Sequence, residues 1–202
     1  PILMRRTLIA LTICATSLFA QPKMRPPAVP LVAHDPYFSV WSMADRLTGE
    51  PTRHWTGTEQ QLTGLLRIDG APFRFMGALP REARAMKQTG LVLTPTSTRY
   101  TFEAGGVRLV FTFLTPALIA DLDLMSRPLT YLVAEVAAVD RKPHQVSLYI
   151  DASAFLAANT PEQRMALSRF RVGAVDALRA GTVDQLALIR SGDNLRIDWG
   201  YV

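Results

Sequence analysis

The sequence is poor in the residues that most often build covalent or metal-binding sites. Its 202 residues include one cysteine and three histidines. Cys14 lies in an N-terminal apolar run, and the histidines stand singly at positions 34, 54 and 144. Thiol nucleophiles, thiolate zinc sites and disulfides are therefore excluded from everything after that run. We expect neither a bound metal ion nor a cofactor.

Self-contained catalytic motifs are also missing. The sequence has no G-x-S-x-G nucleophile elbow, no S-x-x-K, no H-E-x-x-H, no P-loop and no dinucleotide fingerprint of spaced glycines. These absences exclude the commonest self-contained hydrolase and nucleotide-binding classes.

Clustered basic charge is a third absence. The formal net charge is +5, and the isoelectric point is about 9.8. The basic residues are almost all arginine and are scattered singly, often beside apolar residues. A nucleic-acid surface would show a clustered basic stripe interleaved with aromatic residues. We therefore expect no nucleic-acid partner.

No hydrophobic run is long enough for a membrane span. Residues 8–20 are apolar and follow Arg5 and Arg6, but a span needs about 20 such residues. This pattern predicts an export signal over residues 1–20, with three residues before Met4 and cleavage after Ala20. The alternative is a buried N-terminal helix. Ile13 is too large for a lipoprotein site at Cys14. We expect a periplasmic or extracellular protein that is not inserted in a membrane after cleavage, with a net charge reduced to +3.

The rest of the chain has the composition of a folded domain. Residues 21–30 contain four prolines and predict an extended linker. Residues 31–202 are assigned to one β-domain, cut short at its C-terminus. With 49% hydrophobic and 19% charged residues, the chain is not disordered, collagen-like or a coiled coil.

Short alternating runs predict that this domain is an antiparallel β-sandwich, incomplete and with few short helices. Asp69-Gly70 predicts a tight hairpin turn, and Val146, Leu148 and Ile150 are predicted to face inward. The predicted strands are Tyr37–Ser42, Leu65–Ile68, Phe73–Met76, Ser97–Glu103, Val107–Leu114, Leu129–Val139, Gln145–Ile150, Met165–Val172, Gln185–Arg190 and Leu195–Trp199. Pro80–Gln88 and Asp176–Ala180 are helix candidates, and the second is equally compatible with a strand.

Two clusters near the N-terminus are candidate substrate contacts. Asp35 precedes Pro36, so it is either a turn former or an exposed carboxylate of a site. Arg53, His54 and Trp55 combine a cation, an imidazole and a flat ring in one loop, a set that suits recognition of amides or sugars. A tryptophan can equally be a core anchor.

Two further candidates are carboxylates. Asp121 and Asp123 would share one face of an extended segment and could act in calcium binding or in acid–base chemistry. No third ligand is near in sequence, so solvated or structural carboxylates are the alternative. Asp151 ends a predicted strand, where a turn and a functional role are both compatible with the sequence.

Several ordered blocks resemble the N-terminal region of the secreted glutaminase A family. They are Val29–Val32 with Asp35–Trp41, Thr52–Gly57, Leu62–Gly70, Phe75–Gly77, Asp121–Pro128, Val146–Asp151 and Arg196–Tyr201. The resemblance implies an N-terminal β-sandwich followed by a large α-helical toroid domain in a longer protein. It also implies hydrolysis of L-glutamine to L-glutamate and ammonia by an exported enzyme. No catalytic residue of that family can be carried onto a position here.

The leading hypothesis is a cleft-lining or non-catalytic part of an exported glutaminase-like amidohydrolase. We expect this region to be inactive alone, with the main catalytic groups beyond residue 202 and a small amide or a glycan as substrate of the whole protein. The alternative is a carbohydrate-binding or architectural sandwich of a glycosidase-like protein, suggested by the Arg53–Trp55 loop. A sandwich cut within a strand would also leave an open sheet edge and tend to aggregate.

Overall fold

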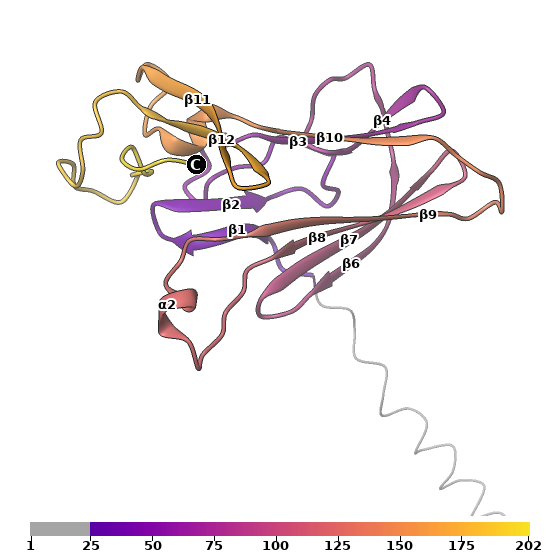
Figure 1. Ribbon diagram of the computed structural model, residues 1–202, viewed down its shortest axis with the longest axis horizontal. Helices are drawn as coiled ribbons and strands as arrows, with labels where there is room; N and C mark the ends of the chain where they lie inside the picture. The colour runs from indigo at the N-terminus through magenta and orange to yellow at the C-terminus, as the bar shows by residue number, and fades with distance from the viewer. Residues whose placement is uncertain (1–24) are drawn as a thin grey trace, which may run out of the picture.

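The computed structural model describes residues 25–202 and confirms a mainly β, sandwich-like fold (Figure 1). The expected signal over residues 1–20 and the first residues of the expected linker lie outside the described range. The first strand, β1 (Val29–Asp35), already includes the last two residues of that linker. No helix among residues 25–202 is long and apolar enough to cross a membrane.

Two four-stranded sheets form the body of the molecule. One sheet has the order β10-β3-β4-β5 and the other has the order β6-β7-β8-β9. Their bounds are β3 Leu62–Ile68, β4 Ala71–Met76, β5 Arg84–Ala85, β6 Lys87–Leu93, β7 Ser97–Ala104, β8 Val107–Leu114, β9 Tyr131–Ala138 and β10 Val146–Ala152. All neighbours are antiparallel except β4 and β5.

Two separate hairpins complete the fold. β1 pairs with β2 (Phe38–Ser42), and β11 (Met165–Val172) pairs with β12 (Val175–Thr182) beside the C-terminus (Figure 1). The short helix α2 (Leu122–Met125) precedes β9, and the 3-10 turn η2 (Ala154–Ala157) follows β10.

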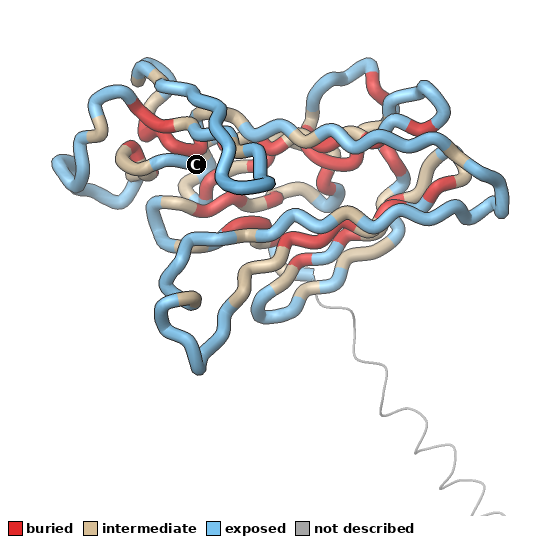
Figure 2. Tube along the Cα trace, viewed as in Figure 1, coloured by how far each residue is buried: buried red, intermediate tan, exposed pale blue. Residues whose placement is uncertain are grey.

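The apolar core lies between the two sheets and the first hairpin. Its centre is aromatic: the ring of Phe75 lies 4.9 Å from that of Phe111 and 5.8 Å from that of Phe102, and all three are buried. The alternation predicted for β7 and β8 is confirmed, because Tyr100, Phe102, Val107, Leu109, Phe111 and Phe113 are all buried. Most of the buried hydrophobic residues precede residue 115, and Figure 2 shows the buried positions in red.

Three turns meet at one end of the sandwich. The predicted hairpin turn at Asp69-Gly70 is confirmed, with φ of +49° and +88°. His144 precedes β10 and bridges two of the turns: its Nδ1 lies 2.6 Å from Asp69 Oδ2 and its Nε2 lies 3.0 Å from Asp140 Oδ1. Gly106, in the β7–β8 turn, lies so close that an added Cβ would meet Asp140 Oδ2 at 2.5 Å. This His144 clasp links the β3–β4 turn to the β9–β10 connection.

Three predicted elements are wrong. Residues 185–190 are not a strand, because Gln185 and Leu188 have φ of +47° and +56°, which an extended strand does not allow. Residues 195–199 make single hydrogen bonds to different partners instead of a ladder. Residues 80–88 are not a helix; Ala83 and Met86 are buried from an extended segment that pairs with β4, so their three-residue spacing only imitated a helix. The Asp176–Ala180 segment takes the strand alternative.

The predicted burial of β10 is also wrong. Val146 and Leu148 are exposed, and of the three predicted residues Ile150 alone packs against the core. The three share one face, as expected from alternation, but β10 is an edge strand and nothing among residues 25–202 covers that face beyond it.

Candidate functional site

The first element of the candidate site is the turn between β1 and β2. Asp35 Oδ1 accepts hydrogen bonds from the backbone N–H of Tyr37 at 2.7 Å and of Phe38 at 3.0 Å. This is the Asx turn that an aspartate before a proline favours. The other carboxylate oxygen of Asp35 has no hydrogen-bond partner in the described part of the chain, and the residue is exposed. Asp35 therefore forms the turn and still presents a free carboxylate oxygen.

The loop around residue 53 packs directly against this turn. Arg53 exchanges backbone hydrogen bonds with Trp41, and its guanidinium donates to Gly57 O at 3.0 Å. Its side chain also pairs with Glu50 at 3.4 Å and Glu59 at 3.5 Å. The charge of Arg53 is thus used to hold the loop, which makes it a poor candidate for binding an anionic substrate.

His54 is fully buried and serves the loop rather than proton transfer. Its Nε2 lies 3.1 Å from the carbonyl of Pro36, which can only accept, so Nε2 carries the hydrogen. Its Nδ1 is then free to accept from Thr56, whose hydroxyl lies 2.9 Å away. Burial and the nearby Arg196 guanidinium lower the pKa of His54. A neutral, doubly hydrogen-bonded imidazole positions the loop.

Trp55 is held at one edge and open on a face. Its indole N–H donates to the same Pro36 carbonyl at 2.6 Å, and its ring is 5.7 Å from that of His54. The residue is 48% exposed. The core-anchor alternative for Trp55 is therefore wrong, and the ring is available at the surface.

Sequence reasoning did not select Arg196 and Asp198, two buried charged residues near the C-terminus. The Arg196 guanidinium donates to Asn159 O at 2.9 Å, Thr58 Oγ1 at 3.0 Å and Asn194 Oδ1 at 2.9 Å. Asp198 Oδ2 accepts from Gln163 at 3.0 Å and lies 3.4 Å from Arg190. The signal was present as two charges alternating with apolar residues in the block Arg196–Tyr201.

This alternation places the apolar residues of the C-terminal segment on a pocket. Ile197 donates its backbone N–H to Tyr37 O at 2.8 Å, which fixes the segment beside the Asp35 turn. Ile197, Trp199 and Tyr201 line the pocket, while Arg196 and Asp198 face buried polar partners. The buried contacts of Arg196 and Asp198 therefore hold Ile197, Trp199 and Tyr201 in the pocket lining.

The pocket has a volume of about 450 Å³, within the range of roughly 300–1,000 Å³ typical of small-molecule sites. Its walls are mostly apolar, and its polar lining residues are His34, Asp35, Thr130 and Tyr201. His34 Nε2 lies 3.2 Å from Thr130 Oγ1, and its ring stacks on Phe38 at 5.8 Å. Burial lowers the pKa of His34, so the imidazole is neutral near pH 7. An apolar wall, a neutral imidazole and an exposed carboxylate thus converge.

The other two predicted residues lie elsewhere. Asp121 is the N-cap of α2, with Oδ1 accepting from Leu124 N at 2.9 Å, so the predicted extended pair with Asp123 is wrong; helix capping satisfies this carboxylate instead. Asp151 lies on β10 and accepts from the Tyr149 hydroxyl at 3.0 Å. Neither residue lines the pocket, and neither do Arg53, His54 and Trp55, so Asp35 is the one predicted residue in its lining. Residues 25–202 contain no group of three or more side chains placed to hold a metal ion.

Two known families match different parts of the chain. Residues 96–202 match a family described as a domain of unknown function, DUF5127. This chain belongs to the DUF5127 family. A second family, domain of unknown function DUF4964, matches residues 9–86.

One curated relative extends across both matches. Glutaminase A of Aspergillus oryzae is 31% identical over 186 residues, covering 87% of this chain and 26% of the relative. The resemblance to glutaminase A drawn from the sequence blocks is confirmed. The chain spans about a quarter of the length of that relative. No solved structure matches this chain.

The pocket lies where the two matched regions meet. His34, Asp35 and Phe38 come from the DUF4964 match, whereas Thr130, Ile197 and Trp199 come from the DUF5127 region. Ligand sites occur preferentially at such junctions, because each part can supply one wall. The DUF5127 region therefore contributes most of the apolar wall, and the DUF4964 region contributes the imidazole of His34 and the carboxylate of Asp35.

Proposed function

We propose that this chain is part of an exported glutaminase-like amidohydrolase and that the 450 Å³ pocket is one wall of its substrate site. The observation that carries the proposal is the similarity to Glutaminase A across both walls of a pocket with a free carboxylate. The signal-like residues 4–20 support export to the periplasm or the medium.

The reaction is hydrolysis of the side-chain amide of an amino acid such as L-glutamine, in which water replaces ammonia. The free oxygen of Asp35 suits the α-ammonium group, and the apolar wall of Ile197 and Trp199 suits the methylene chain. The neutral His34 can exchange a hydrogen bond with the amide or carboxylate.

The groups that activate water and protonate the leaving ammonia are assigned to the remaining polypeptide, in a helical domain packed beyond this region. Residues 25–202 alone are expected to be inactive. His54 does not act as a general base, because both of its nitrogens are engaged in hydrogen bonds.

The test is release of ammonia from L-glutamine by the full-length protein, compared with the Asp35→Asn variant. Asparagine keeps the Oδ1 acceptor of the turn and removes the charge. A lost charge-assisted hydrogen bond of about 1.5–3 kcal/mol raises KM about 10-fold or more. The control is Asp121→Asn, another exposed aspartate that accepts a backbone hydrogen bond, which should leave KM unchanged. No ammonia from the parent protein would refute the activity; an unchanged KM in Asp35→Asn would refute the site.

The exposed face of Trp55 supports a second candidate, a glycan-binding surface. If the full-length protein released no ammonia but was retained on a polysaccharide gel, and Trp55→Ala abolished retention while Trp55→Phe kept most of it, this candidate would replace the first.

A further inference from the structure

The sandwich interior is open along one side, at strands β9 and β10. On β3, Leu66 and Ile68 are 1–2% exposed, yet their direct cross-strand partners on β10, Leu148 and Val146, are 46% and 41% exposed. Cross-strand partners share one face of a sheet. On the interior face of the first sheet, the side chains of β3 are therefore buried and those of the neighbouring strand β10 are exposed.

The second sheet shows the same step. Phe113 and Leu109 on β8 are fully buried, but their partners on β9, Leu132 and Val136, are 40% and 39% exposed. β9 and β10 are the edge strands of their sheets on this side. Both apolar faces thus lie open together.

The backbone edges are equally unprotected. Val139 donates to Gly106 O, and Asp69 N donates to Gln145 O, so alternation directs the N–H groups of Val136 and Leu148 away from the neighbouring strands. The two ladders are continuous over eight and seven residues without a bulge. Each strand carries one charged residue, Glu135 or Asp151.

The opposite edges have the protection that proteins normally use. β5 is two residues long and contains Arg84, and β6 begins with Lys87 and has a bulge between Gln88 and Gly90. Short strands, bulges and basic residues discourage further pairing. β9 and β10 lack the features that protect β5 and β6, so these two edges are open to pairing with a further strand.

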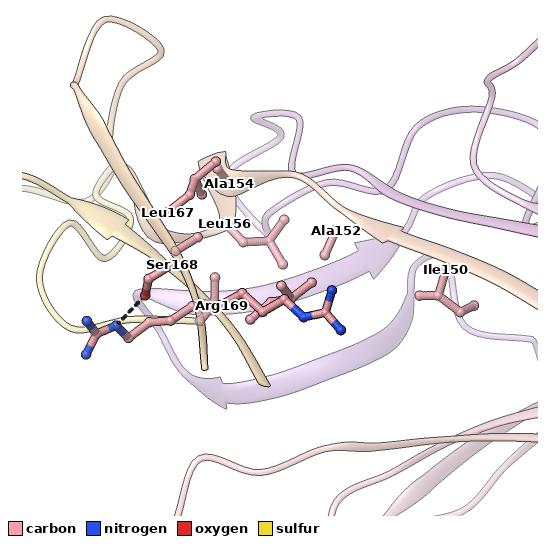
Figure 3. A pocket seen from close by; sticks show the side chains of 11 residues that line it. Ile150, Ala152, Ala154, Leu156, Leu167, Ser168 and Arg169 are labelled. Atoms are coloured by element: carbon pink, nitrogen blue, oxygen red, sulfur yellow. Dashed lines mark hydrogen bonds between the residues drawn. The ribbon is translucent and has the colours of Figure 1, made fainter. Parts of the chain in front are cut away.

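An apolar groove of about 620 Å³ continues the open side beyond β10. Figure 3 shows Ile150 and Ala152 of β10, Leu156 of η2 and Leu167 of β11, which line the groove. Apolar residues of β10 and of the β11–β12 hairpin thus line one groove.

We infer that β9 and β10 are docking edges for β-strands from another part of the same polypeptide, which extend both sheets and close the sandwich. A curated relative more than three times as long as this chain has the additional residues to supply them. A strand is the occupant that satisfies the outward N–H groups as well as the apolar side chains. The inference rests on the same longer protein as the proposed function, but not on its activity.

The test is amide hydrogen exchange, resolved to single residues, on the full-length protein and on the 202-residue chain. In the full-length protein, the outward amides of Val136 and Leu148 should exchange at least 100-fold more slowly than in the 202-residue chain. The inward-bonded amides of Ala137 and Tyr149 should be protected in both. Two variants test whether the side chains of β10 are covered. Leu148→Lys should lower the Tm of the full-length protein, whereas Tyr149→Lys, on the other face of the strand, should not.

Three results would overturn the inference. Rapid exchange at Val136 and Leu148 in the full-length protein, with Ala137 and Tyr149 protected, would mean that no strand pairs there and that a helix or solvent faces the edge. Protection in the 202-residue chain that rises with protein concentration would make a second copy the occupant. Protection in that chain at a concentration where it is monomeric would place the partner within its own residues. Ammonia release is not measured, so failure of the proposed activity leaves this result intact.

Discussion

The parts of the chain before and after residue 115 bury different kinds of residue. Residues 29–114 supply the apolar core, including its aromatic centre, and within residues 25–202 Leu156 is the single member of the core cluster that comes later. Within residues 115–202 the buried polar side chains are Asn159, Thr182, Arg196 and Asp198, and the buried apolar ones are confined to Leu156, Ala157 and Ala158. The large apolar side chains of this part are mostly exposed.

The two kinds of buried residue contribute differently to the free energy of unfolding and to the arrangement of the chain. An apolar core gains free energy in proportion to the area removed from water, whereas a buried polar network contributes little net stability but specifies one arrangement. The first part therefore carries the stability of the fold. The second part is arranged by hydrogen bonds around a pocket and carries the surfaces that we assign to substrate and to further strands.

The largest expected difference is between a core and a surface substitution. Phe111→Ala, at a fully buried ring in contact with Phe75, should lower the free energy of unfolding by about 3–5 kcal/mol. Leu178→Ala, at a residue 79% exposed on β12, should change it by less than about 0.5 kcal/mol in the 202-residue chain. Urea unfolding of both variants measures this. Equal losses would show that the two parts share one core.

An intermediate effect is expected at the polar network. Arg196→Lys keeps the charge but cannot donate to Asn159, Thr58 and Asn194 together, so it should lower stability by about 2 kcal/mol. Arg171→Lys, at an exposed arginine of β11, is the matched control and should be near neutral. The loss should appear as faster exchange of the Arg196 backbone N–H, which donates to Asn159 Oδ1, with the amides of β7 and β8 unaffected. Faster exchange throughout both parts would contradict the division.

The smallest effect is a pH dependence at the His144 clasp. Hydrogen bonds to Asp69 and Asp140 raise the pKa of His144 above 6.5, and the pKa values of both carboxyls are lowered below 3.8. The histidine contribution is complete below pH 6.5 and is lost as pH rises through the raised pKa; the carboxylate contribution is complete above pH 3.8 and is lost as pH falls through the lowered values. The clasp should therefore stabilise most between about pH 4 and 6.5.

His144→Gln isolates this contribution. Burial lowers the pKa values of His34 and His54, so their effect on stability has the opposite sign and is common to both proteins. The difference in Tm between wild type and His144→Gln should be largest near pH 5.5 and should shrink toward pH 9. A difference that is constant with pH would show that His144 acts by packing alone.

The core could be predicted from the sequence because its signals are local. Alternation in Ser97–Glu103 and Val107–Leu114 and the Asp69-Gly70 turn each specify a strand or a turn without reference to distant residues. The same patterns are misleading for residues 80–88, where tertiary pairing with β4 overrides a helical spacing. They are also misleading for residues 185–190, where Gln185 and Leu188 have positive φ and the Gln185 side chain bonds to Thr182 and Gly200.

The candidate site was predicted only in part, because it is assembled from three separate segments. His54 and Trp55 do lie beside the Asp35 turn, joined to it through the Pro36 carbonyl, and Arg53 precedes them in the same loop. The sequence could not show that Trp199 would line the same pocket as Asp35. The contacts of Arg196 with Thr58 and of Ile197 with Tyr37, which place this segment, join residues more than a hundred positions apart. The prediction for Asp121 and Asp151 rests on the chemistry of a carboxylate alone, and helix capping and strand pairing place both residues away from the pocket.

Native-state hydrogen exchange of the 202-residue chain tests the division of the molecule most directly. The amides of β7 and β8 should exchange only through global unfolding, at the free energy that urea reports. Those of β11 and β12 should exchange through local opening at a free energy several kcal/mol lower. A single free energy of exchange for all four strands would contradict the account.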